Sequence, residues 1–380
     1  MTKACYVGVA GKARKVKKIY VGVANKARKV KKGYVGVGGK ARPFFSAEQK
    51  LEYYGTVTPL SSARWLLAAT TVGDYALFAG GAAPYTSAYP VYSTVDAYST
   101  SLVRSSPTEL SKTGYDLAAT SVGGYALFGG GATLGTAFKT VDAYSTSLVR
   151  SSPTELSQER TDLAATTVGG YALFGGGNDG TLLSAQAFST VDAYSTSLVR
   201  SNPTGLIQGR FDLAATTVGN YGMFGGGVAD GSTFTYVDAY SPALVRSNIN
   251  MSQQRTSLAA TTVGGYALFG GGATGRQVDA FNAYLVLTTT TGLSPSRERM
   301  AATTVEGYGL FGGGTILANF SGSNTVDAYS TSLVRSTPTP LSQKRTDLAA
   351  TTVGGYALFG GGNDGGSTSL TVDAYTVGGG

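Results

Sequence analysis

Residues 161–180 read TDLAATTVGGYALFGGGNDG, and residues 346–365 repeat the same twenty residues without a change. Working outward from this stretch, the motif YALFGG or a close variant occurs seven times, 42 to 50 residues apart, with its tyrosine at Tyr75, Tyr125, Tyr171, Tyr221, Tyr266, Tyr308 and Tyr356. A second motif, VDAY or VDAF, follows each copy, with its aspartate at Asp96, Asp142, Asp192, Asp238, Asp279, Asp327 and Asp373. The repetition predicts one structural unit copied seven times.

Within one unit, the residue types predict four short β-strands. In the unit around Tyr171 they cover residues 163–168, 171–175, 191–195 and 198–200, with tight turns after the first and the third. Val, Thr, Tyr and Phe dominate these runs, and no apolar pattern keeps a helical period over ten or more residues. Seven such units at this period indicate an all-β propeller, in which radial blades leave only short, protected sheet edges.

These units resemble the Kelch-repeat β-propellers. The resemblance rests on the Gly-Gly doublet that ends the second strand, the Val-Asp-Ala-Tyr third strand and the arginine that opens the next unit, and it covers about residues 51–377. Kelch units usually carry a tryptophan near the fourth strand, whereas this neighbourhood reads Ser-Leu-Val-Arg here and Trp65 is the only tryptophan. The resemblance implies a seven-bladed, Kelch-like β-propeller.

The last unit ends before a fourth strand. Residues 57–64 align with residues 153–160 of an internal unit, which places residues 52–54 where other units have Leu-Val-Arg. We therefore expect residues 51–58 to complete the last blade and close the ring, which covers an edge that would otherwise pair with other chains. The predicted division is a propeller over residues 46–380 and a small β-hairpin module over residues 1–45.

The composition excludes much enzymology. The chain has no histidine and one cysteine, Cys5, which excludes Ser/His/Asp and Cys/His nucleophile systems, imidazole-based metal sites and intramolecular disulfides. A glycosidase would need two acidic residues that face each other in one pocket, and the sequence offers no obvious pair. We therefore expect no enzyme activity, no cofactor and no metal site.

Two charged residues recur with the units. Arginine precedes the first strand at Arg64, Arg160, Arg210, Arg255, Arg297 and Arg345, and the aspartate of Val-Asp-Ala lies in all seven third strands. They form either a ring of charges that grips a ligand or a structural pair repeated once per blade. We favour the structural pair, because a reaction centre needs one asymmetric constellation.

The units differ most between the second and third strands, where the loops contain 13, 9, 13, 9, 5, 11 and 9 residues. In a propeller these loops open on one face, together with the connections between blades. The candidate ligand-binding residues there are Tyr85, Tyr89, Tyr92, Phe138, Asn178, Asp179, Phe188, Phe234, Tyr236 and Phe320. Rigid aromatics among small polar residues resemble a paratope. The alternatives are that several rings form the cores of their own loops, and that Asn-Asp-Gly serves as a turn.

Residues 1–45 carry a different repeat, of period 14, in which Tyr-Val-Gly-Val-x-x-Lys-Ala-Arg starts at Tyr6, Tyr20 and Tyr34. Permissive residue pairs after each Tyr-Val-Gly-Val predict β-hairpins rather than helix. This module holds 13 of the 30 Lys and Arg residues and no acid, which leaves 17 basic against 22 acidic residues elsewhere, so an anionic partner is expected. The candidate docking or anion-binding residues are Lys12, Arg14, Lys15, Lys17, Lys18, Lys26, Arg28, Lys29, Lys31, Lys32, Lys40 and Arg42.

The same module resembles N-terminal modules of predicted tail-associated proteins in phages and prophages of Gram-positive gut bacteria, over about 40 residues. The sequence shows neither a secretory signal nor a membrane span. We therefore expect synthesis in the cytoplasm, no membrane insertion, and residence in a virion or tail-like particle.

The leading hypothesis is a non-enzymatic virion or tail protein whose loop face binds a cell-surface glycan or protein receptor. Its basic module would bind other virion or tail proteins, or a further copy of the chain in a homo-oligomer. The alternative is an intracellular Kelch-like scaffold with a basic arm that binds nucleic acid, although no known DNA or RNA module matches the arm.

Overall fold

The computed structural model describes residues 6–9, 12–15, 20–23, 26–29, 32–37, 40–46, 49–83, 90–181 and 185–379. The chain divides into two compact units, Met1–Glu52 with Thr376–Gly380, and Tyr53–Tyr375. Every regular element of the described residues is a β-strand. No helix in this part of the chain is long and apolar enough to cross a membrane.

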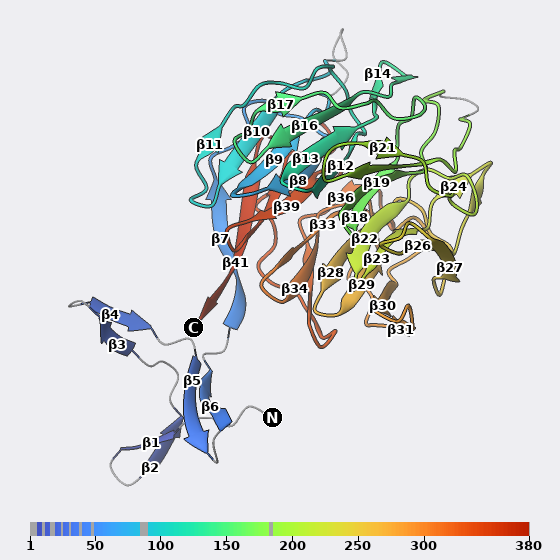
Figure 1. The fold of residues 1–380 in the computed structure, drawn as a ribbon. Coiled ribbons are helices and arrows are strands. Elements are labelled where there is room, and N and C mark those ends of the chain that lie inside the picture. The colour runs from blue at the N-terminus through green and yellow to red at the C-terminus, as the bar shows by residue number, and fades with distance from the viewer. Residues whose placement is uncertain are drawn as a thin grey trace. The chain divides into compact units, whose positions relative to one another are not determined.

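The described residues of the second unit form seven four-stranded antiparallel sheets, called blades 1 to 7 in chain order (Figure 1). The first strands of blades 1 to 7 are β8 (Ala68–Val72), β12 (Ala118–Val122), β18 (Ala164–Val168), β22 (Ala214–Val218), β28 (Ala259–Val263), β33 (Ala301–Val305) and β39 (Ala349–Val353). The second strands are β9 (Tyr75–Ala79), β13 (Tyr125–Gly129), β19 (Tyr171–Gly175), β23 (Tyr221–Gly225), β29 (Tyr266–Gly270), β34 (Tyr308–Gly312) and β40 (Tyr356–Gly360).

The third strands are β10 (Val95–Ser99), β16 (Val141–Ser145), β20 (Val191–Ser195), β26 (Tyr236–Tyr240), β30 (Val278–Asn282), β37 (Val326–Ser330) and β41 (Val372–Gly379). The outer strands are β11 (Arg104–Ser105), β17 (Arg150–Ser151), β21 (Arg200–Ser201), β27 (Arg246–Asn250), β31 (Leu287–Thr289), β38 (Arg335–Ser336) and β7 (Gln49–Val57). Blade 7 therefore takes its outer strand, β7, from the segment that precedes blade 1 (Figure 1). The predictions of an all-β chain and of repeated, propeller-like four-stranded units are confirmed.

The outer strand is displaced from its predicted place. Residues 198–200 were expected in blade 3, whereas β21 covers Arg200–Ser201. Leu198 belongs to the preceding turn, because its φ of 61° is left-handed and its N–H donates to the Ser195 carbonyl over 2.9 Å. The turn thus takes the first two residues that the sequence assigned to the strand.

In blade 7, Tyr53 rather than the aligned Tyr54 stands in for the outer-strand arginine. Arg150 of blade 2 donates from Nη1 to Asp142 Oδ1 over 2.9 Å, and the Tyr53 hydroxyl donates to Asp373 Oδ1 over 2.6 Å. Burial, and then this hydrogen bond, raise the pKa of Tyr53 to about 12. The outer strand of blade 7 is thus shifted by one residue relative to the alignment. Gly55 follows at this point, and its φ of 122° is accessible to glycine but strained for other residues.

The innermost strands show why the unit reads Ala-Ala-Thr-Thr-Val. Thr166 Oγ1 of blade 3 lies 2.9 Å from Thr217 Oγ1 of blade 4, and the Thr217 hydroxyl donates to the Thr167 carbonyl over 2.8 Å. The same pairing joins Thr71 of blade 1 to Thr351 of blade 7 over 2.8 Å. Each hydroxyl group has a hydrogen-bond partner between the closely packed first strands of two blades. The two threonines of the motif therefore connect a blade with its neighbour.

The glycine that ends a second strand leaves room for the next blade. A Cβ atom on Gly175 would lie 2.8 Å from Cε1 of Phe224 in blade 4. Phe224 is fully buried and meets Tyr240 edge-on, with ring centroids 6.0 Å apart. Much of the high glycine content therefore reflects tight packing between blades rather than flexibility.

A buried arginine organises the loop end of six of the described blades. In blade 3, Arg160 donates from Nη1 to the carbonyls of Gly176 and Thr190, both over 2.8 Å, and from Nη2 to Asp192 over 2.5 Å. Asp192 also accepts from the N–H and the hydroxyl group of Ser157, in the preceding connection. The expectation of a structural pair is confirmed, and the pairs are Arg64–Asp96, Arg160–Asp192, Arg210–Asp238, Arg255–Asp279, Arg297–Asp327 and Arg345–Asp373.

Within residues 6–46, the described strands form three antiparallel hairpins. They are β1 (Tyr6–Val9) with β2 (Lys12–Lys15), β3 (Tyr20–Val23) with β4 (Lys26–Lys29), and β5 (Lys32–Val37) with β6 (Lys40–Ser46). The prediction of hairpins rather than helix is confirmed for these residues. Each hairpin is a separate two-stranded sheet.

Removing one carboxylate tests the structural role of the buried ion pair. In Asp192→Ala the guanidinium group of Arg160 stays buried without a charged partner, so the free energy of unfolding should fall by about 3–5 kcal/mol. Urea denaturation measures the change. Asp179→Ala, at a turn of the same blade, is the control and should cost less than about 1 kcal/mol. Equal losses in the two variants would contradict this role.

Candidate functional site

The strand register defines two different ends of each blade. In blade 1, Ala68 at the start of β8 pairs with Ala79 at the end of β9, which pairs with Val95 at the start of β10. The loops between second and third strands therefore leave the blade at the same end as the segments that precede the first strands. We call this end the loop face, and the end with the two-residue turns, such as Gly169-Gly170, the turn face.

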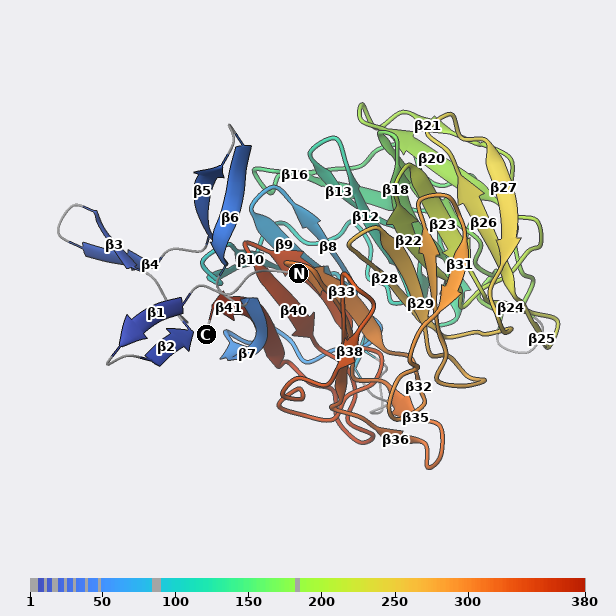
Figure 2. The same ribbon diagram turned by 90° about the horizontal axis from the view of Figure 1, so that it is seen from below.

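Three loops on the loop face contain hairpins of their own. They are β14 (Ala132–Thr133) with β15 (Thr136–Ala137) in blade 2, β24 (Val228–Ala229) with β25 (Ser232–Thr233) in blade 4, and β35 (Thr315–Ile316) with β36 (Ser321–Gly322) in blade 6, which β32 (Arg297–Glu298) extends. Figure 2 shows the hairpins of blades 4 and 6 along one margin of the second unit. The apolar tips Leu134 and Phe320 are 69% and 80% exposed.

Four of the candidate aromatic residues occupy one repeated position. They are Tyr92, Phe138, Phe188 and Phe234. The backbone N–H of each donates to the carbonyl of the last glycine after the second strand of its blade. The carbonyl of each accepts from the backbone N–H of the residue at the buried-arginine position of the next blade. Phe138 is only 3% exposed and the other three are half-buried. This placement agrees with the alternative that these rings form loop cores, and it leaves Phe138 without surface for a ligand.

The remaining candidates divide between exposed and structural positions. Tyr236 is half-buried and stacks on Phe234, with ring centroids 5.5 Å apart, and Phe320 is the most exposed aromatic candidate that the structure describes. Asn178 is buried and donates to Asp162, while Asp179 accepts from the backbone of Thr181 and Gln186. The contacts of Asp179 are those of a turn, and so is the bond that the Asn178 side-chain oxygen accepts from the Gly180 N–H, whereas the Asn178–Asp162 bond joins this loop to a residue outside it. Tyr85 and Tyr89 lie outside the described residues.

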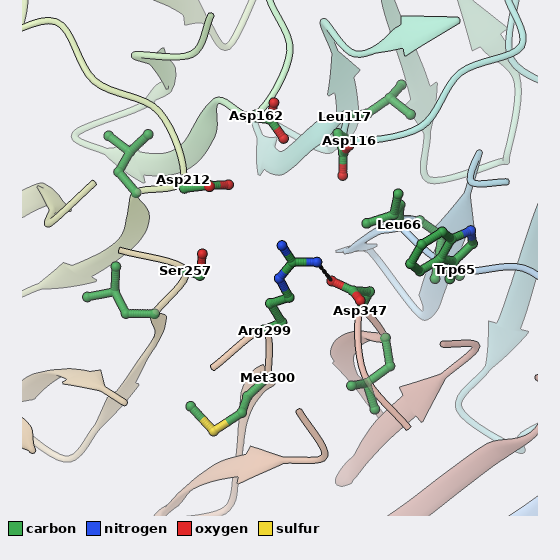
Figure 3. A pocket seen from close by; sticks show the side chains of 14 residues that line it. Trp65, Leu66, Asp116, Leu117, Asp162, Asp212, Ser257, Arg299, Met300 and Asp347 are labelled. Atoms are coloured by element: carbon green, nitrogen blue, oxygen red, sulfur yellow. Dashed lines mark ion pairs between the residues drawn. The ribbon is translucent and has the colours of Figure 1, made fainter. Parts of the chain in front are cut away.

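At the centre of the loop face lies a cavity of about 380 Å³ (Figure 3). Each blade contributes the residue two positions after the buried-arginine position, and all seven have a left-handed φ of 51° to 53°. Six backbone N–H···O=C bonds of 2.9 to 3.2 Å connect the seven positions in succession from Asp116 through Leu66 to Asp162. These axial residues are Leu66, Asp116, Asp162, Asp212, Ser257, Arg299 and Asp347.

Four axial carboxyl groups and one guanidinium group point toward one another (Figure 3). Burial, and then the charges of the neighbouring aspartates, raise the pKa of Asp116 well above its ordinary value and the pKa of Asp212 to about 7. Burial also raises the pKa of Asp162 and Asp347. Arg299 opposes these shifts, but its Nη1 lies 3.9 Å from Asp347 Oδ1 and the side chain is 52% exposed.

A signal for this cluster is present in the sequence, at a position that neither of the two recurring motifs covers. The column two residues after the recurring arginine reads Leu, Asp, Asp, Asp, Ser, Arg, Asp over the seven units. Its members differ in charge and size, and a propeller brings such a column to one axis. With all groups ionised, the cavity carries four negative charges and one positive charge, which favours a cationic or hydrogen-bond-donating group there.

The other predicted sites are placed only in part. No group of three or more Cys, Asp or Glu residues in the described part of the chain is arranged to hold a metal ion. Of the candidate docking residues, Lys17, Lys18 and Lys31 lie outside the described residues, and the others lie on the strands β2, β4, β5 and β6. The chain matches no family model and no curated protein sequence.

The raised pKa of Asp212 predicts how stability depends on pH. A carboxyl group with a higher pKa in the folded state than in the unfolded state contributes stability that is complete below its unfolded pKa and is lost as pH rises through about 7. Asp212→Asn should therefore be about 2 kcal/mol more stable than the parent protein at pH 8, with a smaller difference at pH 5. Thermal unfolding at both values measures this. Asp230→Asn, at an exposed hairpin tip, is the control, and an equal response of both variants would refute the assignment.

Proposed function

We propose that the second unit is a closed, seven-bladed, Kelch-like propeller. Three contacts support closure: the Thr71–Thr351 hydroxyl pair between blades 1 and 7, the addition of β7 to blade 7, and the succession of backbone hydrogen bonds along the axial residues. A closed ring leaves no first or last blade with an open inner strand, which suits a rigid platform for variable loops.

On this platform, we propose a non-enzymatic binding function in a phage-type virion or tail. The observation that carries the proposal is the contrast between the two faces. The tight turns of the turn face keep one length and differ at few positions, such as Pro242-Ala243 and Ala283-Tyr284, whereas the loop face combines loops of 5 to 13 residues with the axial cavity. Binding sites concentrate on loops that a rigid scaffold positions. The ligand of this face is a cell-surface glycan or protein.

The basic module serves to attach this platform to a particle. Its residues 1–45 carry thirteen positive charges and no negative one, and the described strands are short hairpins rather than a second large core. A charge of this density on a small module favours an acidic protein surface. Nucleic acid remains the alternative partner of this module.

The loop face is tested by binding of the full-length protein to cell walls purified from Gram-positive gut bacteria. Phe320→Ala removes the most exposed described candidate aromatic and should weaken binding about tenfold, as expected for an anchor residue. Val199→Ala, exposed on the turn face, is the control and should bind like the parent protein. Equal binding by all three proteins would exclude the Phe320 hairpin from the site.

The same cell walls distinguish binding from hydrolysis. The axial aspartates meet the first requirement of a glycosidase, since acidic residues face each other in one pocket and their pKa values are raised. The binding function predicts no release of reducing sugar. Release that is lost in Asp212→Asn would replace binding by hydrolysis as the function of this face.

Deletion of residues 1–45 tests the role of the basic module. The shortened protein should keep the thermal unfolding transition of the propeller and should no longer be incorporated into particles. Incorporation is measured by the amount of the protein that sediments with particles. Unchanged incorporation would contradict the docking role, and a steep salt dependence of DNA retention by the module would favour the nucleic-acid alternative.

A further inference from the structure

The outer strands of most blades are short because proline follows them. In blades 1, 2, 3 and 6 the outer strand has two residues, and a proline stands three residues after its arginine, at Pro107, Pro153, Pro203 and Pro338. Proline has no N–H and cannot continue a hydrogen-bonded ladder. Proline on a sheet edge is one of the devices that prevent pairing with other chains.

Blade 4 lacks this protection. The segment between Arg246 and the buried Met251 is one residue shorter than its counterpart in blade 3 and contains no proline. Its outer strand β27 therefore runs for five residues, Arg246–Asn250, and all five pair with β26. β27 is the last strand of its sheet, and Ser247, Asn248 and Asn250 are exposed.

The extended strand is built into the packing of the neighbouring blade. In six blades a tyrosine of the third strand donates its hydroxyl to a threonine carbonyl in the preceding connection, as Tyr240 does to Thr204 over 2.8 Å. In the connection that precedes blade 5, Ile249 lies two residues before Met251, as Thr204 lies two residues before Leu206 in the connection that precedes blade 4. Blade 5 has Phe281 in place of the tyrosine. Ile249 packs against the cluster that contains Phe281. Blade 5 thus lacks the tyrosine hydroxyl at the one connection whose carbonyl, that of Ile249, belongs to a strand.

We propose that β27 is an oligomerisation edge, which pairs antiparallel with β27 of a second copy of this chain. A two-fold axis through Asn248 places Ser247 opposite Ile249 and Arg246 opposite Asn250 of the partner, so no charge faces a like charge. The one charged residue, Arg246, is already paired with Asp238 over 3.7 Å. Because β27 already pairs with β26 on one side, the N–H and C=O groups of alternate residues face the free edge. These groups then supply the affinity, as in other cases of strand addition.

This self-complementarity distinguishes a second copy from other partners. A strand with no acidic residue and one neutralised base offers no charge pattern for an oppositely charged peptide, but it matches itself residue by residue. The proposal concerns the side of the propeller and does not depend on the function of the loop face.

Sedimentation equilibrium of the full chain at 0.15 M salt tests the pairing. The parent protein should form a dimer as its concentration rises. Asn248→Lys sets two positive charges opposite each other on the two-fold axis and should shift the equilibrium to monomer at least tenfold. Ser152→Lys, at the same position of the proline-protected blade 2, is the control and should dimerise like the parent protein.

A second variant blocks the strand pairing without adding charge, so it separates the loss of backbone pairing from the repulsion between the two lysines. Ile249→Pro copies the proline that ends the outer strand in four other blades, and it should also be monomeric while it keeps the parent's circular dichroism spectrum. A monomeric parent protein at 100 μM would overturn the proposal. A dimer that survives both Asn248→Lys and Ile249→Pro would overturn it equally.

Discussion

The architecture of the loop face depends on a guanidinium group that is buried at the end of six blades. Arg160 reaches the carbonyls of Gly176 and Thr190 and the carboxylate of Asp192, which belong to the ends of two strands. A buried ion pair of this kind adds little net stability compared with apolar residues of the same size. Its effect lies in geometry, because the planar guanidinium accepts few arrangements of its partners. Loops of very different length therefore begin and end at strand ends that are held in the same arrangement.

Blade 2 shows that another side chain can fill the same space. Gly114 stands at the arginine position, and a Cβ atom there would lie 2.4 Å from Cζ of Phe138. The ammonium group of Lys112 lies 4.7 Å from the centre of the Phe138 ring. Asp142 keeps the contacts with Arg150 and Ser111 that its counterparts have. An aromatic ring with a cation beside it thus replaces the arginine, which is consistent with the small net gain from the ion pair.

These cases explain what the sequence could predict. Strands, turns and ion pairs recur six or seven times, so the pattern of the copies identified them without knowledge of their contacts. The exposure of single loop residues was not predictable in this way. Phe138 and Phe320 are both phenylalanines in loops of the same type, but one fills the space beside Gly114 and the other lies at a hairpin tip. Only contacts with residues distant in the sequence separate them.

The axial residues show where the copies were free to diverge. Leu66, Ser257, Arg299 and the four aspartates share one left-handed backbone conformation, although such a conformation costs an L-residue roughly 1–2 kcal/mol. The surrounding blade structure, rather than the identity of the side chain, therefore determines the backbone conformation at these positions. Stability alone would favour a small neutral residue such as Ser257 at each position. Burial raises the pKa of all four aspartates, and the charges of neighbouring aspartates raise the pKa of Asp116 and Asp212 further, so their ionisation weakens the fold. The aspartates are thus a cost to folding that the architecture does not require, which supports the proposal that the loop face binds a ligand.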